Sequence, residues 1–282
     1  MGQKRRIAIF THGDYAWSFP TWANTLPILK ERHDIIGIYL FSRKMGHLKG
    51  LQIPQWFLRV FGPVNCLLLS AYSMKTRLMQ VSGPVRGWDQ LASRYDVPLH
   101  YADTPHSQHV CEWVKENRVD IILIMVWHIL KKEIIESPRI GIINKHTALL
   151  PSYRGVFPFF CARLKGDPIG ITFHEVDVGI DTGAILLQER CPEREDAHSG
   201  PSLLRFYIET FSRYPSMVLH AIERLGEGHH IPLAAGVTPS YYGFPTRNDY
   251  RQFKKAGHKI ARMSDLFYAP DGWTSRKTGG ES

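Results

Sequence analysis

Residues suited to acyl transfer are concentrated in one short part of the chain. Asn144 and His146 stand two positions apart after an apolar run, and Asp181 follows in a turn flanked by glycines. A carboxamide is a neutral donor for an oxyanion, and a His near neutrality can stabilise that charge or move a proton. An Asp whose pKa is raised by a pocket can orient the imidazole and relay protons. We therefore take Asn144, His146 and Asp181 as the candidate catalytic residues.

Each of these residues also has a purely structural interpretation. Asn144 can cap a turn, His146 can be a satisfied loop histidine, and Asp181 can hydrogen-bond to the backbone of its own turn. Taken singly, each residue fits that role at least as well. Two residues at i and i+2 project to the same side of an extended chain, so the surrounding elements decide whether the three share a site.

The elements around these residues alternate between strands and helices. Strands are expected at 7–10, 35–41, 98–101, 120–126 and 141–144, and helices at 17–32, 87–95, 110–117 and 131–136. This alternation predicts an α/β fold with a Rossmann-like, doubly wound, mostly parallel sheet. Ligands bind at the carboxyl ends of the strands in such sheets, and Asn144 and His146 come at or just past such an end.

The pattern changes after position 170. Two strands, 171–178 and 184–189, surround the turn that carries Asp181, and a long helix kinked near Pro215 is expected over 203–225. An amphipathic stretch follows at 250–256. We expect a catalytic domain over 1–200 and a small C-terminal extension, rich in loops, over 201–282.

Residues 42–80 form an insertion in the first domain that is rich in aromatic, aliphatic and basic residues. The interpretation that we favour is an inserted helical pair that covers the sheet. A basic, amphipathic surface that contacts a membrane or holds an apolar ligand is the alternative. Polar residues and a proline interrupt its apolar face, which is why that alternative is less favoured.

Composition limits the class of protein but not its partner. The chain has 282 residues, 44% of them hydrophobic, and a formal charge of +9. It can build a full core, and its basic surface suits anionic partners without selecting one. The four cysteines are widely spaced, which predicts reduced thiols in a cytoplasmic protein and no metal site. We expect neither a signal peptide nor a transmembrane helix.

Three motifs, in order and at a fitting separation, resemble the formyltransferase family that uses 10-formyltetrahydrofolate. They are Asn-x-His at 144–146, Ala-Leu-Leu-Pro-x-x-Arg-Gly at 148–155 and Ile-Asp-x-Gly at 180–183. The family includes methionyl-tRNA formyltransferase, glycinamide ribonucleotide transformylase and sugar-nucleotide N-formyltransferases. The likeness is clear over 120–188, weaker over 6–41, and absent from 42–80 and beyond 226.

The resemblance implies roles for these residues. Asn144 and His146 would stabilise the oxyanion, and Asp181 would assist proton transfer from the acceptor amine. The pterin of the co-substrate, 10-formyltetrahydrofolate, would lie between two loops. The residues expected to bind it are Val126, Trp127, His128, Ile129, Leu130, Val178, Gly179 and Ile180.

The resemblance does not determine which amine accepts the formyl group. The first loop differs from the phosphate loop of the purine enzyme, and the part after 225 is short for the β-barrel of the tRNA enzyme. A small amine, such as an amino sugar on a nucleotide, is the expected partner, and no nucleic acid is expected. Residues expected to contact it are His12, Asp14, Tyr15, Arg154 and Tyr242.

Other interpretations remain open from the sequence. They are a formyltetrahydrofolate hydrolase, a formyltransferase for a lipid-, carrier- or tRNA-linked amine, and a non-catalytic folate or nucleotide binder. A homodimer and a peripheral membrane contact through 42–80 are further expectations, the second less favoured.

Overall fold

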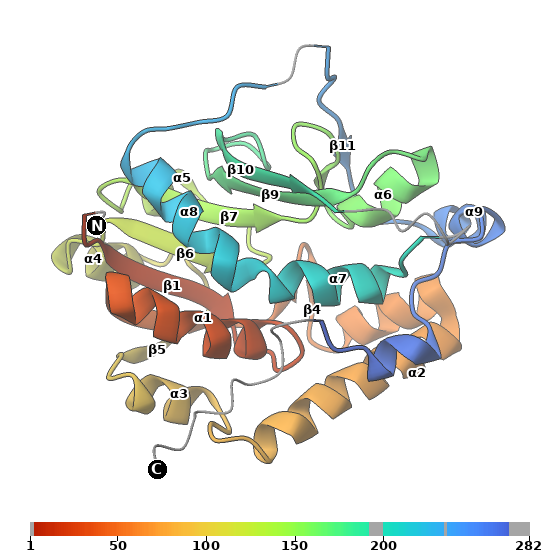
Figure 1. Cartoon of the computed structure of the whole chain (residues 1–282), viewed down its shortest axis with the longest axis horizontal. Helices are drawn as coiled ribbons and strands as arrows, with labels where there is room; N and C mark the ends of the chain where they lie inside the picture. Colours follow the sequence, from red (N-terminus) through yellow and green to blue (C-terminus); the bar gives the residue numbers. More distant parts are fainter. Residues whose placement is uncertain (1–2, 192–199, 234–235, 271–282) are drawn as a thin grey trace.

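A computed structural model describes residues 3–191, 200–233 and 236–270. Its main sheet has seven strands in the order β10-β9-β7-β6-β1-β2-β5 (Figure 1). The strands are β1 (Arg6–His12), β2 (Asp34–Phe41), β5 (Leu99–Ala102), β6 (Ile121–Met125), β7 (Gly141–His146), β9 (Gly170–Glu175) and β10 (Ile185–Arg190).

Five neighbouring strands, β5, β2, β1, β6 and β7, are parallel. Strand β9 runs antiparallel to β7, and β10 runs antiparallel to β9. The sheet is thus mostly parallel, with an antiparallel edge beside β7. The α/β, Rossmann-like fold predicted from the sequence is confirmed.

The central strands are buried on both faces, which explains their continuous apolar sequences. In β1, Ile7 and Ile9 belong to the core on one face, whereas Ala8 and Phe10 belong to the core on the other. Figure 1 shows α1 (Ser18–Arg32) and α8 (Tyr214–Gly226) in front of the sheet, with α4 (Gln108–Glu116) and α5 (Lys132–Ile135) behind it. Helix α3 (Trp88–Arg94) packs near β5.

The helix expected over 203–225 is two helices in the structure. Helix α7 (Leu203–Ser212) ends before Arg213, and Pro215 lies in the first turn of α8. A proline is tolerated there because no intrahelical partner is needed for its missing N–H. Helix α8 packs on β7, β9 and β10, so this segment shares the core of the sheet. The domain boundary at 200 stays a prediction.

Two short α-helices, a 3-10 helix and a small two-stranded sheet lie in the second half of the described chain. Helix α6 (Pro158–Lys165), which the sequence did not predict, follows β8 (Arg154–Gly155), and β8 pairs with β11 (Tyr241–Tyr242). Helix α9 (Arg247–Lys255) covers the amphipathic stretch expected at 250–256. A 3-10 helix, η1 (Met263–Phe267), follows it.

The insertion at 42–80 is mostly helical. A hairpin of β3 (Lys44–Met45) and β4 (Leu48–Lys49) leads into α2 (Gln52–Val81), which is interrupted by non-helical backbone at Gly62. The insertion is therefore helical, as we favoured, but its main helical contacts are with α9 and η1 and not, as we expected, with the sheet. Contrary to the expectation from the sequence, α2 is long and apolar enough, by length and composition alone, to cross a membrane.

Candidate active site

Neighbouring antiparallel strands bring together the first part of the site. Asn144 on β7 pairs in register with His174 on β9. Asn144 Nδ2 lies 3.1 Å from His174 Nε2, while His174 Nδ1 lies 2.7 Å from the carbonyl oxygen of Glu175. Because that carbonyl can only accept, Nδ1 carries the proton and Nε2 accepts from the carboxamide. His174 thereby fixes which end of the Asn144 amide is the nitrogen.

A tight turn brings Asp181 to the same place. Asp181 itself has a positive φ of 51°, an unusual conformation for a residue other than glycine. A Cβ on Gly183 would stand 1.9 Å from the carbonyl oxygen of Glu175, so only glycine lets the turn fold back this closely. The turn therefore returns the carboxylate toward the end of β7.

The three predicted catalytic residues do share one site. Asn144 Nδ2 lies 3.5 Å from Asp181 Oδ1, and His146 Nδ1 lies 3.5 Å from Asp181 Oδ2. His174 Nε2 is also 3.5 Å from Asp181 Oδ1, and the backbone N–H of Gly155 donates to Oδ2 at 2.9 Å. The carboxylate is thus surrounded by nitrogen atoms from three strands.

The charge state of Asp181 differs from what we predicted. Burial by itself would raise its pKa, but its contacts with His174, with His146 and with the backbone N–H of Gly155 together lower it to about 2. The expectation of a raised pKa is therefore wrong, because the folded turn supplies donors that the sequence did not reveal. Asp181 is a fixed negative charge at neutral pH.

His146 is held in one tautomer by its neighbours. Its Nε2 lies 2.8 Å from the carbonyl oxygen of Tyr153, so Nε2–H donates and Nδ1 faces Asp181. Burial lowers the pKa of His146, opposed by the charge of Asp181 and the hydrogen bond to Tyr153. The ring is neutral at rest, and a proton gained at Nδ1 would be stabilised by the carboxylate.

The loop at 126–130 begins beside Asn144, because Ile124 on β6 is the register partner of Asn144. Trp127 and Ile129 expose apolar side chains (51% and 66% of their surface), while Leu130 is buried and Val126 packs on the core. In the turn of Asp181, Val178 and Ile180 are exposed too. Exposed apolar groups on both loops fit a flat heteroaromatic ring.

His12, at the end of β1, supports this loop from beneath. Its Nε2 accepts a hydrogen bond from the backbone N–H of Trp127 at 2.9 Å, and its Nδ1 lies 3.4 Å from the carbonyl oxygen of Phe41. Burial lowers the pKa of His12. Burial and the nearby His12 likewise lower the pKa of His128 to about 4, so both rings are neutral at pH 7.

The other residues expected to contact the acceptor lie in two places. Asp14 accepts hydrogen bonds from three backbone N–H groups at the start of α1, and the Tyr15 ring lies under Arg77. Arg154 and Tyr242 lie on β8 and β11, where the Tyr242 ring stacks on Tyr153. The acceptor roles of His12, Asp14, Tyr15, Arg154 and Tyr242 stay predictions.

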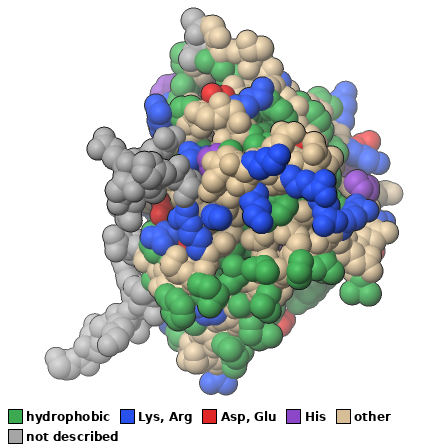
Figure 2. All heavy atoms as spheres, turned by 90° about the vertical axis from the view of Figure 1, so that its right-hand side faces the viewer, with side chains coloured by type: hydrophobic (Ala, Val, Ile, Leu, Met, Phe, Trp, Pro, Cys, Tyr) green, Lys and Arg blue, Asp and Glu red, His purple; other side chains and the backbone are tan. Residues whose placement is uncertain are grey.

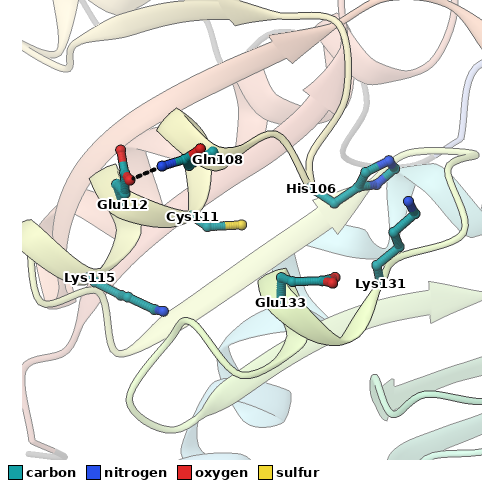
Figure 3. A pocket seen from close by; sticks show the side chains of 7 residues that line it. All are labelled: His106, Gln108, Cys111, Glu112, Lys115, Lys131 and Glu133. Atoms are coloured by element: carbon teal, nitrogen blue, oxygen red, sulfur yellow. Dashed lines mark hydrogen bonds between the residues drawn. The ribbon is translucent and has the colours of Figure 1, made fainter.

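A pocket elsewhere lies between α4 and the start of α5 (Figure 3). Charged groups of both signs line it, and Gln108 donates to Glu112 across one side. None of the predicted catalytic residues lines it. In the parts of the chain that the structure describes, no cluster of three or more His, Cys, Asp or Glu residues could hold a metal ion.

Sequence reasoning missed His174 and the supporting contact of His12. A histidine in a predicted strand gives no sign of its register, so His174 could not be linked to Asn144. It also missed that Lys145, between the two catalytic candidates, points into the core, where its Nζ lies 3.1 Å from the centre of the Phe211 ring. Burial lowers the pKa of Lys145 well below its usual range.

Comparisons with known proteins find formyltransferases in sequence and in structure. Residues 89–200 match the family described as formyl transferase. Methionyl-tRNA formyltransferase of Clostridium botulinum is 37% identical over 112 residues, which cover 39% of this chain. The same match spans only 36% of that relative's length.

Two solved structures share the fold. Glycinamide ribonucleotide transformylase 1 from Symbiobacterium toebii has a TM-score of 0.55 at 16% identity, covering 83% of this chain and 93% of that one. An N-formyltransferase from Helicobacter canadensis, solved with folinic acid and dTDP-3-aminofucose, has a TM-score of 0.51 at 16% identity. The match covers 88% of this chain and 72% of that one. These structural likenesses are of fold alone, whereas the likeness in sequence is limited to residues 89–200. The match over residues 89–200 supports assignment of this chain to the formyltransferase family.

Proposed function

We propose that this protein transfers the formyl group of 10-formyltetrahydrofolate to the amine of a small acceptor. The observation that carries the proposal is the meeting of Asn144, His146 and Asp181, with each pair that includes Asp181 joined at 3.5 Å. An amide donor, an imidazole and an ionised carboxylate supply what acyl transfer to an amine requires.

Each of the three residues would have a separate role in the transfer of the formyl group. The Asn144 carboxamide, oriented by His174, donates toward the oxygen that becomes negative. His146 adds a second polar group there and can gain a proton at Nδ1, next to Asp181. Asp181, ionised at neutral pH, attracts the proton that the amine must lose.

The two loops beside this group fit the folate. Trp127 and Ile129 on one loop, with Val178 and Ile180 on the other, would hold the pterin, and Val126, His128, Leu130 and Gly179 would shape the loops around it. When bound, the folate supplies the activated formyl group. The exposed apolar side chains of these loops are otherwise without a covering partner in the described structure.

For the acceptor, we infer an amino sugar attached to a nucleotide. The Helicobacter canadensis structure, which has this fold, contains such a compound, dTDP-3-aminofucose, together with folinic acid. In this chain, Arg154 and Tyr242 lie beside Gly155, whose N–H donates to Asp181. A guanidinium and an aromatic ring suit a diphosphate and a base.

The experiment uses 10-formyltetrahydrofolate and a panel of amines, with tetrahydrofolate release and product mass as readouts. The panel pairs each amino-sugar nucleotide with the same nucleotide bearing a hydroxyl in place of the amine. We expect release that requires the amine, and a product heavier by one formyl group. Release without any amine would point instead to the hydrolase, and an absence of release with intact folate binding would overturn the enzyme proposal.

A further inference from the structure

Helix α2 carries a stripe of apolar side chains that are largely exposed in the described protein. The residues that form this stripe follow helical spacing along its second half: Val64, Leu67, Met74, Leu78 and Val81. All are exposed, with Leu67 at 69%. Soluble monomers rarely display continuous apolar patches of this kind, so we expect this stripe to bind a partner.

The opposite face of the same helix is already used by the fold. Tyr72 and Thr76 are buried, and the Tyr72 ring stacks on Trp17 with 5.1 Å between centroids. Tyr72 also belongs to a core cluster with Leu204 and Ile208 of α7. One face therefore fixes α2 to the protein, and the stripe is left on the other.

Helix η1 adds two more apolar side chains near this helix. Met263 and Phe267 are exposed, Phe267 at 82%. Lys75 of α2 donates to the carbonyl oxygen of Leu266, which holds η1 alongside α2. Figure 2 shows hydrophobic side chains gathered on the lower part of this side of the molecule. We call the stripe of α2 together with Met263 and Phe267 the apolar face.

The exposed charges of α2 and α9 are all positive, and Asp265 of η1 is buried. Helix α2 contains no acidic residue, and its Arg59 is exposed. Neighbouring α9 exposes four cations, Arg247, Arg251, Lys254 and Lys255. The single acid of α9, Asp249, is occupied by the backbone N–H and hydroxyl of Thr246. Figure 2 shows a band of Lys and Arg directly above the hydrophobic area.

We propose that the apolar face and the cations of α9 dock this protein on the surface of an anionic lipid bilayer. An amphipathic helix with a basic border lies in the interface, with apolar side chains among the acyl chains and cations near the head groups. The chain's net charge of +9 favours the same surface.

Two other partners fit these residues less well. A two-fold contact with a second copy would place the same surface on both sides, bringing Arg59 and the α9 cations toward their own like charges with no acid on α2 to pair with them. A membrane-spanning α2 would remove Tyr72 and Thr76 from their buried positions, and the backbone is non-helical at Gly62. A helix lying in the interface keeps both features.

The test is flotation of the full chain with vesicles of phosphatidylglycerol and phosphatidylcholine in equal amounts, and with phosphatidylcholine alone. We expect binding to the anionic vesicles, weakened by salt, and much weaker binding to the neutral ones. The double variant Leu67→Gln/Leu78→Gln should lower the partition coefficient on the order of tenfold to a hundredfold, because two apolar side chains no longer insert.

Matched variants make the result specific. Leu233→Gln/Val237→Gln changes two other exposed aliphatic residues, outside the apolar face, and should bind as the unmodified chain does. Lys254→Glu/Lys255→Glu should weaken binding to anionic vesicles while leaving the unfolding midpoint in urea unchanged. Circular dichroism and light scattering accompany each variant.

Three results would overturn the proposal. One is an absence of binding to anionic vesicles, and another is equal binding by the unmodified chain and Leu67→Gln/Leu78→Gln. The third is a dimer in solution that this double variant dissociates, with no vesicle binding, which would assign the apolar face to a second copy. Because flotation needs neither folate nor acceptor, its failure would leave the proposed function untouched.

Discussion

Asn144 on β7 and His174 on β9 face each other across two antiparallel strands, with 3.1 Å between Asn144 Nδ2 and His174 Nε2. The other nitrogen of His174 donates to the carbonyl of Glu175. The imidazole is therefore an acceptor fixed by the backbone, and it holds the carboxamide nitrogen in place. This relationship places an orienting residue behind a candidate catalytic one.

Replacing His174 with Ala should lower kcat on the order of tenfold to a hundredfold, because the amide of Asn144 loses the acceptor that orients it. His174→Asn, which restores an acceptor on the side chain, should recover part of the loss. Steady-state kinetics at saturating folate checks this. An unchanged kcat in His174→Ala would remove the residue from the site, provided that the variant unfolds at the same urea concentration.

The change Asp181→Asn should lower kcat by about a hundredfold or more, since a neutral amide neither attracts the amine proton nor stabilises a protonated His146. Because the pKa of Asp181 is lowered to about 2, the acid limb of the pH–rate profile should belong to another group. We expect kcat/KM to be independent of Asp181 ionisation above pH 4. An acid limb that disappears only in Asp181→Asn would contradict this assignment.

His12→Leu removes the acceptor for the Trp127 N–H while keeping an apolar side chain of similar size. The unpaired backbone donor costs about 1–3 kcal/mol, so the loop at 126–130 should shift. We expect KM for the folate to rise about tenfold, with a smaller change in kcat. His220→Leu, at an exposed position on α8, is the control. Equal KM values in the two variants would show that His12 does not support the loop.

Gly155→Ala tests the donor to Asp181. At Gly155 the φ is +94°, and a Cβ would meet the carbonyl oxygen of Tyr242 at 2.3 Å. The substitution should destabilise the fold by about 1–3 kcal/mol and move the N–H that donates to Asp181. Gly243→Ala, where nothing lies within 4 Å of the Cβ, should leave stability and activity unchanged. Similar urea midpoints for the two variants would argue against a strained turn.

Stability should fall as the solution is acidified, and His128 is one cause. Burial and neighbouring positive charge lower its pKa to about 4 in the folded protein. The unfolded chain, with a pKa near 6.5, therefore binds the proton first, and stability is lost between pH 6.5 and pH 4. His128→Asn should make the free energy of unfolding less sensitive to pH over that window. An identical pH dependence would show that His128 contributes nothing.

The strands were readable from the sequence because buried parallel strands are continuous apolar runs. The expected strand at 120–126 corresponds to β6, Ile121–Met125, and 35–41 corresponds to β2, Asp34–Phe41. Helix α2 was not readable as one element, because apolar residues occupy both its buried face and its exposed stripe. Its apolar residues therefore do not form the single stripe of helical period by which one buried helix face is recognised in a sequence.

The sequence predicted part of the site, namely the residues that follow directly from the strand pattern. Asn144 and His146 could be placed at a strand end from their neighbours in sequence. The contacts of His174 depend on the register of β9 against β7, and the low pKa of Asp181 depends on His174, on His146 and on the N–H of Gly155, 26 residues away. Contacts between residues on different strands cannot be predicted from the neighbouring residues in the sequence.

The central claim is tested most directly by following an isotopic label. Folate carrying a ¹³C-formyl group is mixed with an amino-sugar nucleotide, and the product is analysed by mass spectrometry and NMR. We predict that the label moves to the amine nitrogen with the unmodified chain, and that Asn144→Ala abolishes transfer while still binding the folate. Label that appears as free formate, or transfer that survives in Asn144→Ala, would contradict the account.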